Sequence, residues 1–102
     1  MLSADDHPMA AEWTLLTNHG ATLLCLADDS RMRMRDIAAR LGITERAVQR
    51  IIADLVDAGY VESRRVGRRN LYEVDGEKPF RRQVLRDHTV GELTALLSRG
   101  RP

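Results

Sequence analysis

A run of helix, turn, helix and hairpin signals over residues 35–74 restricts the fold of this chain more than any other feature. It reads RDIAARLGITERAVQRIIADLVDAGYVESRRVGRRNLYEV. Apolar positions recur at helical spacing on both sides of Gly42, and they alternate on both sides of a later glycine-arginine pair. The segment therefore predicts a fold that is mainly α with a small β-hairpin.

The two helices of this segment are bounded by clear signals. The first is expected at about 34–41, with Gly42 as its left-handed stop. Thr44 is a good N-cap for the second helix, which we expect at about 45–58, closed by Gly59. The buried face of the second helix is an apolar stripe at helical spacing: Val48, Ile51, Ile52 and Leu55.

A β-hairpin is expected directly after the second helix. Gly67 and Arg68 favour a two-residue type II′ turn, because glycine accepts a positive φ at the first central position. That turn places Ser63 opposite Tyr72 on the paired strands. Tyr72 and Val74 then share one face of the hairpin, which can cover the helices.

The flanking segments give weaker signals. Residues 1–8 are expected to be a frayed tail, followed by two helical pieces at about 9–16 and 18–27. Residues 31–33 are compatible with a very short strand. A Thr89–Glu92 capping box indicates a last amphipathic helix at about 90–98.

The chain is long enough for a single domain. We assign residues 9–77 to the helix-turn-helix and hairpin, with the hairpin at about 60–75, and residues 78–102 to a C-terminal extension. A domain of this size has a modest core, and oligomerisation is a common way to stabilise it. Apolar residues near both ends of the chain are the candidates for a dimer interface: Trp13, Leu16, Val90, Leu93, Leu96 and Leu97.

The formal net charge of +1 hides an uneven distribution of charge. Residues 1–30 hold five acidic side chains and no Lys or Arg, whereas residues 31–102 hold all sixteen Lys and Arg against ten acidic side chains. All but one of these cations are Arg, whose guanidinium matches phosphate groups and guanine edges. The separation predicts a surface that faces a polyanion, although an excess of Arg can also reflect a GC-rich coding sequence.

The second helix of the pair has two different faces. Opposite the apolar stripe, its cap and N-terminal half carry polar and charged residues that can reach base edges: Thr44, Glu45, Arg46, Gln49 and Arg50. In bidentate pairs Arg suits guanine and Gln suits adenine, each worth roughly 1–3 kcal/mol of discrimination. The alternative is a solvated face on an ordinary amphipathic helix. The preceding helix and glycine turn favour DNA reading, because they fix the helix at the expected angle.

Cations surround the tip of the expected hairpin. Four arginines and one asparagine lie there: Arg64, Arg65, Arg68, Arg69 and Asn70. Such a cluster repels itself unless an anion is present, and a DNA backbone supplies that anion. The other explanation is a solubilising edge that prevents strand-to-strand aggregation.

Taken together, these residues resemble a winged helix-turn-helix transcriptional regulator of the MarR/ArsR type. The stretch RDIAARLGITERAVQRIIADLVDAGYV is similar to the family's short helix, Gly turn, capped recognition helix and entry to the wing, and VESRRVGRRNLYEV is similar to the wing. The resemblance covers about residues 15–75. It implies that the N-terminal half of the recognition helix occupies the major groove, that Arg64, Arg68 and Arg69 form the wing contacts, and that terminal helices pair two copies as a homodimer.

The function expected from the sequence is sequence-specific binding of double-stranded DNA by a transcriptional regulator. We expect a homodimeric repressor that acts on a pseudo-palindromic operator. The alternative is a winged-helix protein–protein interaction module without sequence-specific DNA binding, which should carry apolar anchors on the outer face of the recognition helix. The sequence contains no catalytic motif, so neither an enzyme nor a cofactor is expected.

Other patterns bear on further classes of protein. Cys25 is alone in the apolar run LLCLA, which predicts a buried and inert thiol. His88 and Glu92 are four residues apart, but His88 precedes the helix cap and no metal site is expected. No run approaches the roughly 18 apolar residues that span a membrane, and residues 1–29 lack the basic part of a secretory signal, so a cytoplasmic protein is expected. A small-molecule effector is left open but not indicated.

Overall fold

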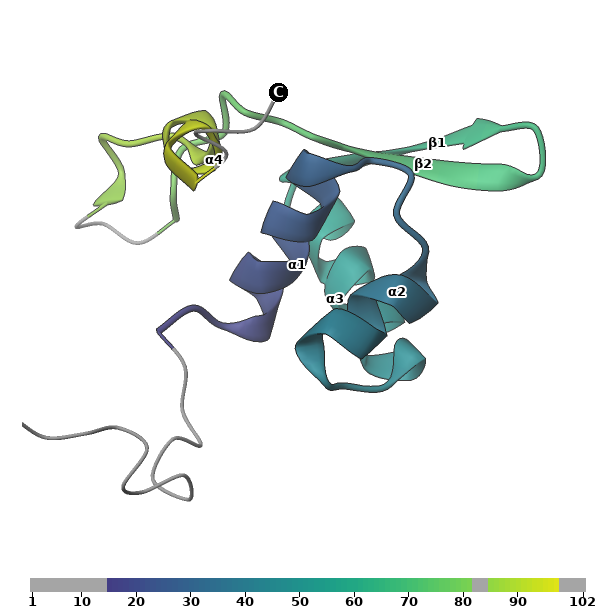
Figure 1. Ribbon diagram of the computed structural model, residues 1–102. Coiled ribbons are helices and arrows are strands. Elements are labelled where there is room, and N and C mark those ends of the chain that lie inside the picture. Colours follow the sequence, from purple (N-terminus) through teal and green to yellow (C-terminus); the bar gives the residue numbers. More distant parts are fainter. Residues whose placement is uncertain (1–14, 82–84, 98–102) are drawn as a thin grey trace, which may run out of the picture.

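The computed structural model describes residues 15–81 and 85–97, which form helices and one β-hairpin. Their order is α1 (Asn18–Asp28), α2 (Met34–Leu41), α3 (Glu45–Asp57), β1 (Val61–Val66), β2 (Arg69–Val74) and α4 (Val90–Leu97). The first three helices pack together, the hairpin extends away from them, and α4 lies at the end of the hairpin opposite its tip (Figure 1). The expected fold class, mainly α with a small β-hairpin, is confirmed.

The turn between α2 and α3 is fixed by local hydrogen bonds. Gly42 is left-handed, with φ 70°, and its N–H donates to the Ala38 carbonyl at 2.8 Å, which ends α2. Thr44 has an extended backbone, and its Oγ1 accepts a hydrogen bond from the Ala47 N–H at 3.0 Å, which begins α3. Residues close together in sequence therefore set where α3 starts, as the sequence predicts.

The core is aliphatic and lies between the three helices and the base of the hairpin. Leu23 and Leu26 of α1 and Ile37 of α2 belong to this cluster. The predicted stripe of α3 is buried in it: Val48, Ile51, Ile52 and Leu55. Because this face of α3 is used for packing, only the opposite face meets solvent.

The hairpin pairs in the predicted register. The cross-strand partners are Val61 with Val74, Ser63 with Tyr72 and Val66 with Arg69. Gly67 has φ 63° and Arg68 does not have a positive φ, as a type II′ turn requires. Tyr72 is buried and Val74 packs against the core, so the expected face of the hairpin covers the helices.

The helix expected at about 9–16 is wrong at its C-terminal end. Leu15 and Leu16 lie in bends, and α1 begins only at Asn18. The cause is Thr17, which has an extended backbone and whose side chain accepts a hydrogen bond from the Gly20 N–H at 3.1 Å. This N-cap fixes the start of α1, so the residues before Thr17 do not continue that helix. The rest of the expected piece, like the expected tail at 1–8, lies outside the described residues.

The short strand expected at 31–33 is also wrong. The chain does run beside β2, because the Tyr72 N–H donates to the Ser30 carbonyl at 3.1 Å. However, the Met32 N–H turns back to the Asp29 carbonyl at 3.0 Å instead of extending a ladder along β2. A turn therefore takes the place of the strand.

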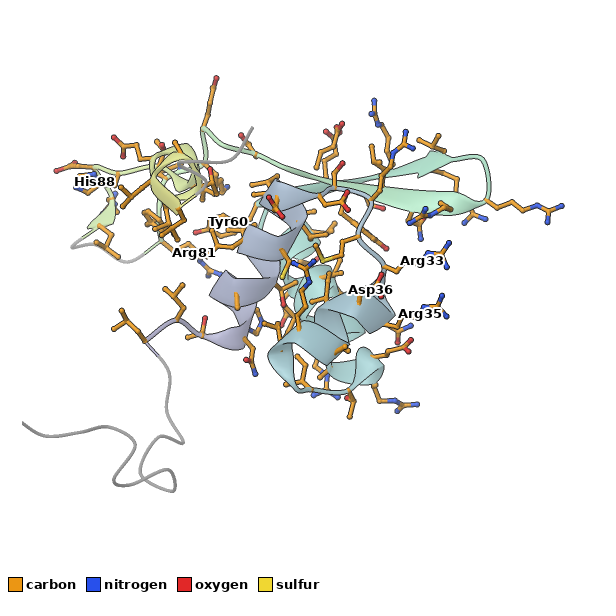
Figure 2. All side chains as sticks on the ribbon, in the orientation of Figure 1. Arg33, Arg35, Asp36, Tyr60, Arg81 and His88 are labelled. Carbon is orange, nitrogen blue, oxygen red and sulfur yellow. The ribbon has the colours of Figure 1, made fainter. Side chains whose placement is uncertain are left out.

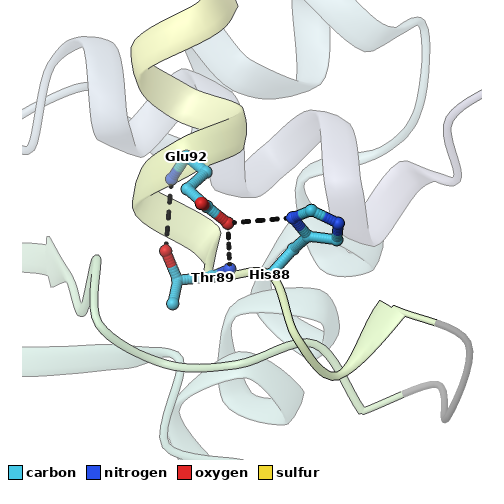
Figure 3. A network of polar contacts seen from close by, with 3 residues as sticks. All are labelled: His88, Thr89 and Glu92. Carbon is cyan, nitrogen blue, oxygen red and sulfur yellow. Dashed lines mark hydrogen bonds and ion pairs between the residues drawn. The ribbon is translucent and has the colours of Figure 1, made fainter.

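Helix α4 begins at the expected capping box (Figure 3). The Glu92 N–H donates to Thr89 Oγ1 at 3.3 Å, and the Thr89 N–H donates to Glu92 Oε1 at 2.8 Å. His88 lies just before the helix, with its Nδ1 3.2 Å from the same carboxylate oxygen. The hydrogen bond from Thr89, and then the one with His88, hold the pKa of Glu92 below its usual value. Position 98 of the expected helix lies outside the described residues.

Backbone hydrogen bonds attach α4 to the chain that leaves the hairpin. The Gly91 N–H donates to the Gly76 carbonyl at 2.7 Å, and the Val90 N–H donates to the Lys78 carbonyl at 2.8 Å. Val90 is fully buried in the core cluster. The two glycines approach so closely that a Cβ at Gly91 would lie 2.6 Å from the Gly76 carbonyl oxygen.

We expect Gly91→Ala to destabilise the fold by about 1–3 kcal/mol, because the new methyl group would push α4 away from the backbone it pairs with. Thermal melting followed by circular dichroism measures this. Gly20→Ala is the matched control, since its Cβ would meet only ordinary contacts, the nearest with Thr17 Oγ1 at 3.6 Å, and this change should leave stability equal or slightly higher. Equal melting temperatures for the two variants would contradict the close approach.

Candidate nucleic-acid interface

The residues predicted to read DNA are all exposed on the first turns of α3 and its cap. They are Thr44, Glu45, Arg46, Gln49 and Arg50. Neither Arg46 nor Arg50 forms an ion pair with another residue in the described ranges. Their guanidinium groups therefore remain open to phosphate oxygens or base edges.

The predicted wing residues are exposed as well, but the register divides them between two faces of the hairpin. They are Arg64, Arg65, Arg68, Arg69 and Asn70. Arg65 and Asn70 are paired and share the face that carries Tyr72. Arg64 and Arg69 fall on the opposite face. The wing therefore offers cations on both sides, not in a single row.

Internal contacts separate the wing arginines further. Arg64 Nη2 lies 3.0 Å from Glu73 Oε2, an exposed pair that adds little stability but reduces the local charge. The guanidinium of Arg69 donates to the main-chain carbonyl of Arg31, which ties the wing to the chain before α2. Arg68 in the turn forms no ion pair with any other described residue. It is the wing cation with the fewest competing contacts.

A third group of cations was missed in the sequence. Arg31, Arg33 and Arg35 are exposed in the loop before α2 and in its first turn. Figure 2 shows Arg33 and Arg35 projecting on the side toward which the hairpin extends. The signal is the pattern RMRMR, which places arginine at every second position and is also compatible with a very short strand.

A groove with mixed charges lies at the C-terminal end of α3. It is lined by His19, Asp54, Leu55, Asp57, Ala58, Tyr60 and Arg81. His19 Nε2 lies 2.8 Å from Asp54 Oδ2, so the Asp54 carboxylate has a hydrogen-bond partner within the groove. Arg81 lies on the other side of the helices from Arg33 and Arg35 (Figure 2). This side therefore does not extend the cationic surface.

Cys25 is half-buried and packs against the core. Burial raises the pKa of its thiol, and the nearby charge of Arg40 only partly opposes this, so the reactive thiolate is disfavoured. Among the described residues, no group of three or more His, Cys, Asp or Glu side chains is placed to hold a metal ion. No helix within those residues has the length and apolar character to cross a membrane.

The apolar residues predicted to form a dimer interface differ in exposure. Leu96 and Leu97 are 62% and 52% exposed at the end of α4, and Leu16 is 39% exposed. Leu93 is partly exposed. Val90 has no exposed surface, because it packs within the core of its own chain. Trp13 lies outside the described residues.

Residues 15–62 match the model of the winged helix-turn-helix DNA-binding family. With the observed helices and hairpin, this match shows a winged helix-turn-helix fold, in which α3 stands at the position of the recognition helix and β1–β2 at the position of the wing. The predicted resemblance to winged helix-turn-helix regulators is confirmed.

The solved structures that are similar to the chain include the following two. One is the zinc-dependent MarR family transcriptional regulator AdcR in its Zn(II)-bound state, with 26% identity and a TM-score of 0.47 over 64% of this chain and 46% of that one. The other is IscR from T. potens, with 18% identity and a TM-score of 0.56 over 91% of this chain and 94% of that one. The second likeness concerns the fold, and the chain spans less than half of AdcR. No curated protein matches the chain.

Proposed function

We propose that the protein is a transcriptional regulator that binds double-stranded DNA in a sequence-specific manner. The observation that carries this proposal is the contrast between the two faces of α3. Its apolar stripe is buried, whereas Arg46, Gln49 and Arg50 are exposed together on its N-terminal half. A helix held in this way can enter the major groove with that half, where Arg pairs with guanine and Gln with adenine.

The wing supplies contacts to the DNA backbone. Arg68 in the turn has no competing ion pair within the described residues, and Arg65 lies close to it on β1. Phosphate contacts carry no sequence information but fix the register of the recognition helix on the duplex. In this function the wing therefore contributes affinity for any duplex, and α3 contributes discrimination between DNA sequences.

The regulator acts in the cytoplasm as a homodimer on a pseudo-palindromic operator, most simply as a repressor that blocks polymerase. The exposed Leu96 and Leu97 support a second copy as the partner, because α4 is short and no other described residue covers its apolar end. Two recognition helices of a symmetric dimer meet half-sites about 34–36 Å apart, one turn of the duplex.

We expect the double variant Leu96→Glu/Leu97→Glu to be monomeric, because charge replaces the apolar surface that a second copy would cover. Light scattering should give one chain mass for the variant and two for the unmodified protein. Val56→Glu is the control, since Val56 is an exposed apolar residue on α3 and its change should leave the dimer intact. A double variant that stays dimeric would mean that α4 is not the interface.

A mobility-shift titration with random-sequence duplex at low salt tests the proposed function. We expect a shift at micromolar protein, as is usual for non-specific binding. Repeated selection of the bound duplexes should then enrich an inverted repeat that binds at least about 1,000-fold more tightly. Absence of any shift would overturn the proposal and favour a protein–protein interaction module.

A further inference from the structure

The three arginines before and within the first turn of α2 are held outward by their neighbours. Met32 is buried in the core cluster, while Arg31 and Arg33 on either side of it are exposed. Arg35 is exposed one residue into the helix. None of the three forms an ion pair with another described residue. Their charges therefore face solvent without a counter-ion from the described part of the chain.

A groove beside these residues has an excess of positive charge. Four arginines and two aspartates line it, together with Met32 and Ala39: Arg31, Arg33, Arg40, Arg69, Asp29 and Asp36. Asp29 Oδ1 accepts a hydrogen bond from the main-chain N–H of Arg31 at 3.0 Å, so this contact neutralises no guanidinium. Asp36 lies in the first turn of α2, where the helix dipole favours an acid. Crowded cations of this kind repel one another until an anion binds.

Hydrogen bonds from β2 hold this segment against the side of the wing, from the first residue of β2 to its middle. The Arg69 guanidinium donates to the Arg31 carbonyl, and the Tyr72 N–H donates to the Ser30 carbonyl at 3.1 Å. The segment and the wing are therefore joined at adjacent points. A DNA backbone that follows the wing would pass close to Arg31 and Arg33.

We propose that Arg31, Arg33 and Arg35 form a second phosphate-binding surface for the same duplex, beside the wing. This inference rests on the proposed function. A backbone held both at the wing tip and at this segment is fixed at two points, which limits how the duplex can rotate under α3. The surface binds phosphate without regard to base sequence and aligns the recognition helix in the groove.

The test compares Arg33→Ala/Arg35→Ala with Arg81→Ala/Arg86→Ala, which removes the same charge from exposed positions elsewhere. The slope of log affinity against log salt is measured for random and for selected duplexes. We expect the first variant to flatten this slope by about 1.8 for each protomer bound to the duplex, since each lost phosphate contact changes it by roughly 0.9. The control should keep the slope of the unmodified protein. Both variants should melt like the unmodified protein, because all four side chains are exposed.

The variant Arg33→Lys/Arg35→Lys separates the effect of losing positive charge from the effect of changing the side chain. Lysine keeps the positive charge, so this variant should retain most of the salt dependence. If it behaves like the alanine variant, or if the alanine variant keeps the full slope, the second surface is overturned while the proposed function stands. Equal flattening in the Arg81 and Arg86 control would also overturn it, since net charge alone would then explain the effect. Failure of the unmodified protein to bind duplex at all would instead overturn the proposed function.

Discussion

Val48→Asp is expected to leave the protein largely unfolded at room temperature. Val48 has no exposed surface and is surrounded by the aliphatic core that joins α3 to the other helices. A carboxylate there would lose its hydration without gaining a partner, or would be protonated at comparable cost, and the penalty is several kcal/mol. The whole stability of a small domain is only about 5–15 kcal/mol. Circular dichroism should show a reduced helical signal and a much lower melting temperature.

The next residue gives the matched control. Gln49 is exposed on the opposite face of α3, so Gln49→Asp should change stability by no more than about 0.5 kcal/mol. The same change places a negative charge on the face proposed to enter the major groove, and DNA binding should fall sharply although the fold is retained. Similar melting curves for the variants at the two positions would mean that the faces of α3 are assigned incorrectly.

Local signals explain why the centre of the fold could be predicted from the sequence. Gly42 and Thr44 act through hydrogen bonds to residues three or four positions away, so their effect does not depend on the rest of the molecule. The hairpin register follows from Gly67 in the turn, because side chains alternate strictly along the paired strands. The Thr17 cap is the same kind of local signal, and α1 begins at Asn18, where the sequence predicts the second helical piece.

Long-range contacts explain what could not be predicted. Whether residues 31–33 form a strand depends on how they meet β2, and the alternation of arginine and methionine fits a turn with outward arginines equally well. The hydrogen bond from Arg69 to the Arg31 carbonyl joins residues 38 positions apart, so no spacing rule anticipates it. The Arg64–Glu73 pair, in contrast, follows from the register, since the two residues are diagonal neighbours on one face of the hairpin. The exposed faces of the site were thus predictable, whereas the internal partners of its arginines mostly were not.

The largest functional effect is expected from Arg46→Glu/Arg50→Glu. Both side chains are exposed on the N-terminal half of α3, and reversing their charge removes two potential contacts and adds two repulsions against phosphate. At roughly 1–3 kcal/mol for each lost contact, affinity for a selected duplex should fall at least about 30-fold. The fold should be nearly unaffected, although the glutamate introduced in place of Arg50 would stand one helical turn before Asp54 and cost a few tenths of a kcal/mol.

The control for this reversal is Arg81→Glu/Arg86→Glu, which changes the net charge by the same amount at exposed positions outside α3 and the wing. Its affinity should change only through the long-range field, and that change should shrink as salt is added, because screening removes interactions beyond about 10 Å at 0.1 M salt. The loss in the α3 variant should persist at the same salt, since its charges meet the duplex at contact distance. Equal losses in the two variants at every salt concentration would show that total charge, rather than the exposed face of α3, governs binding.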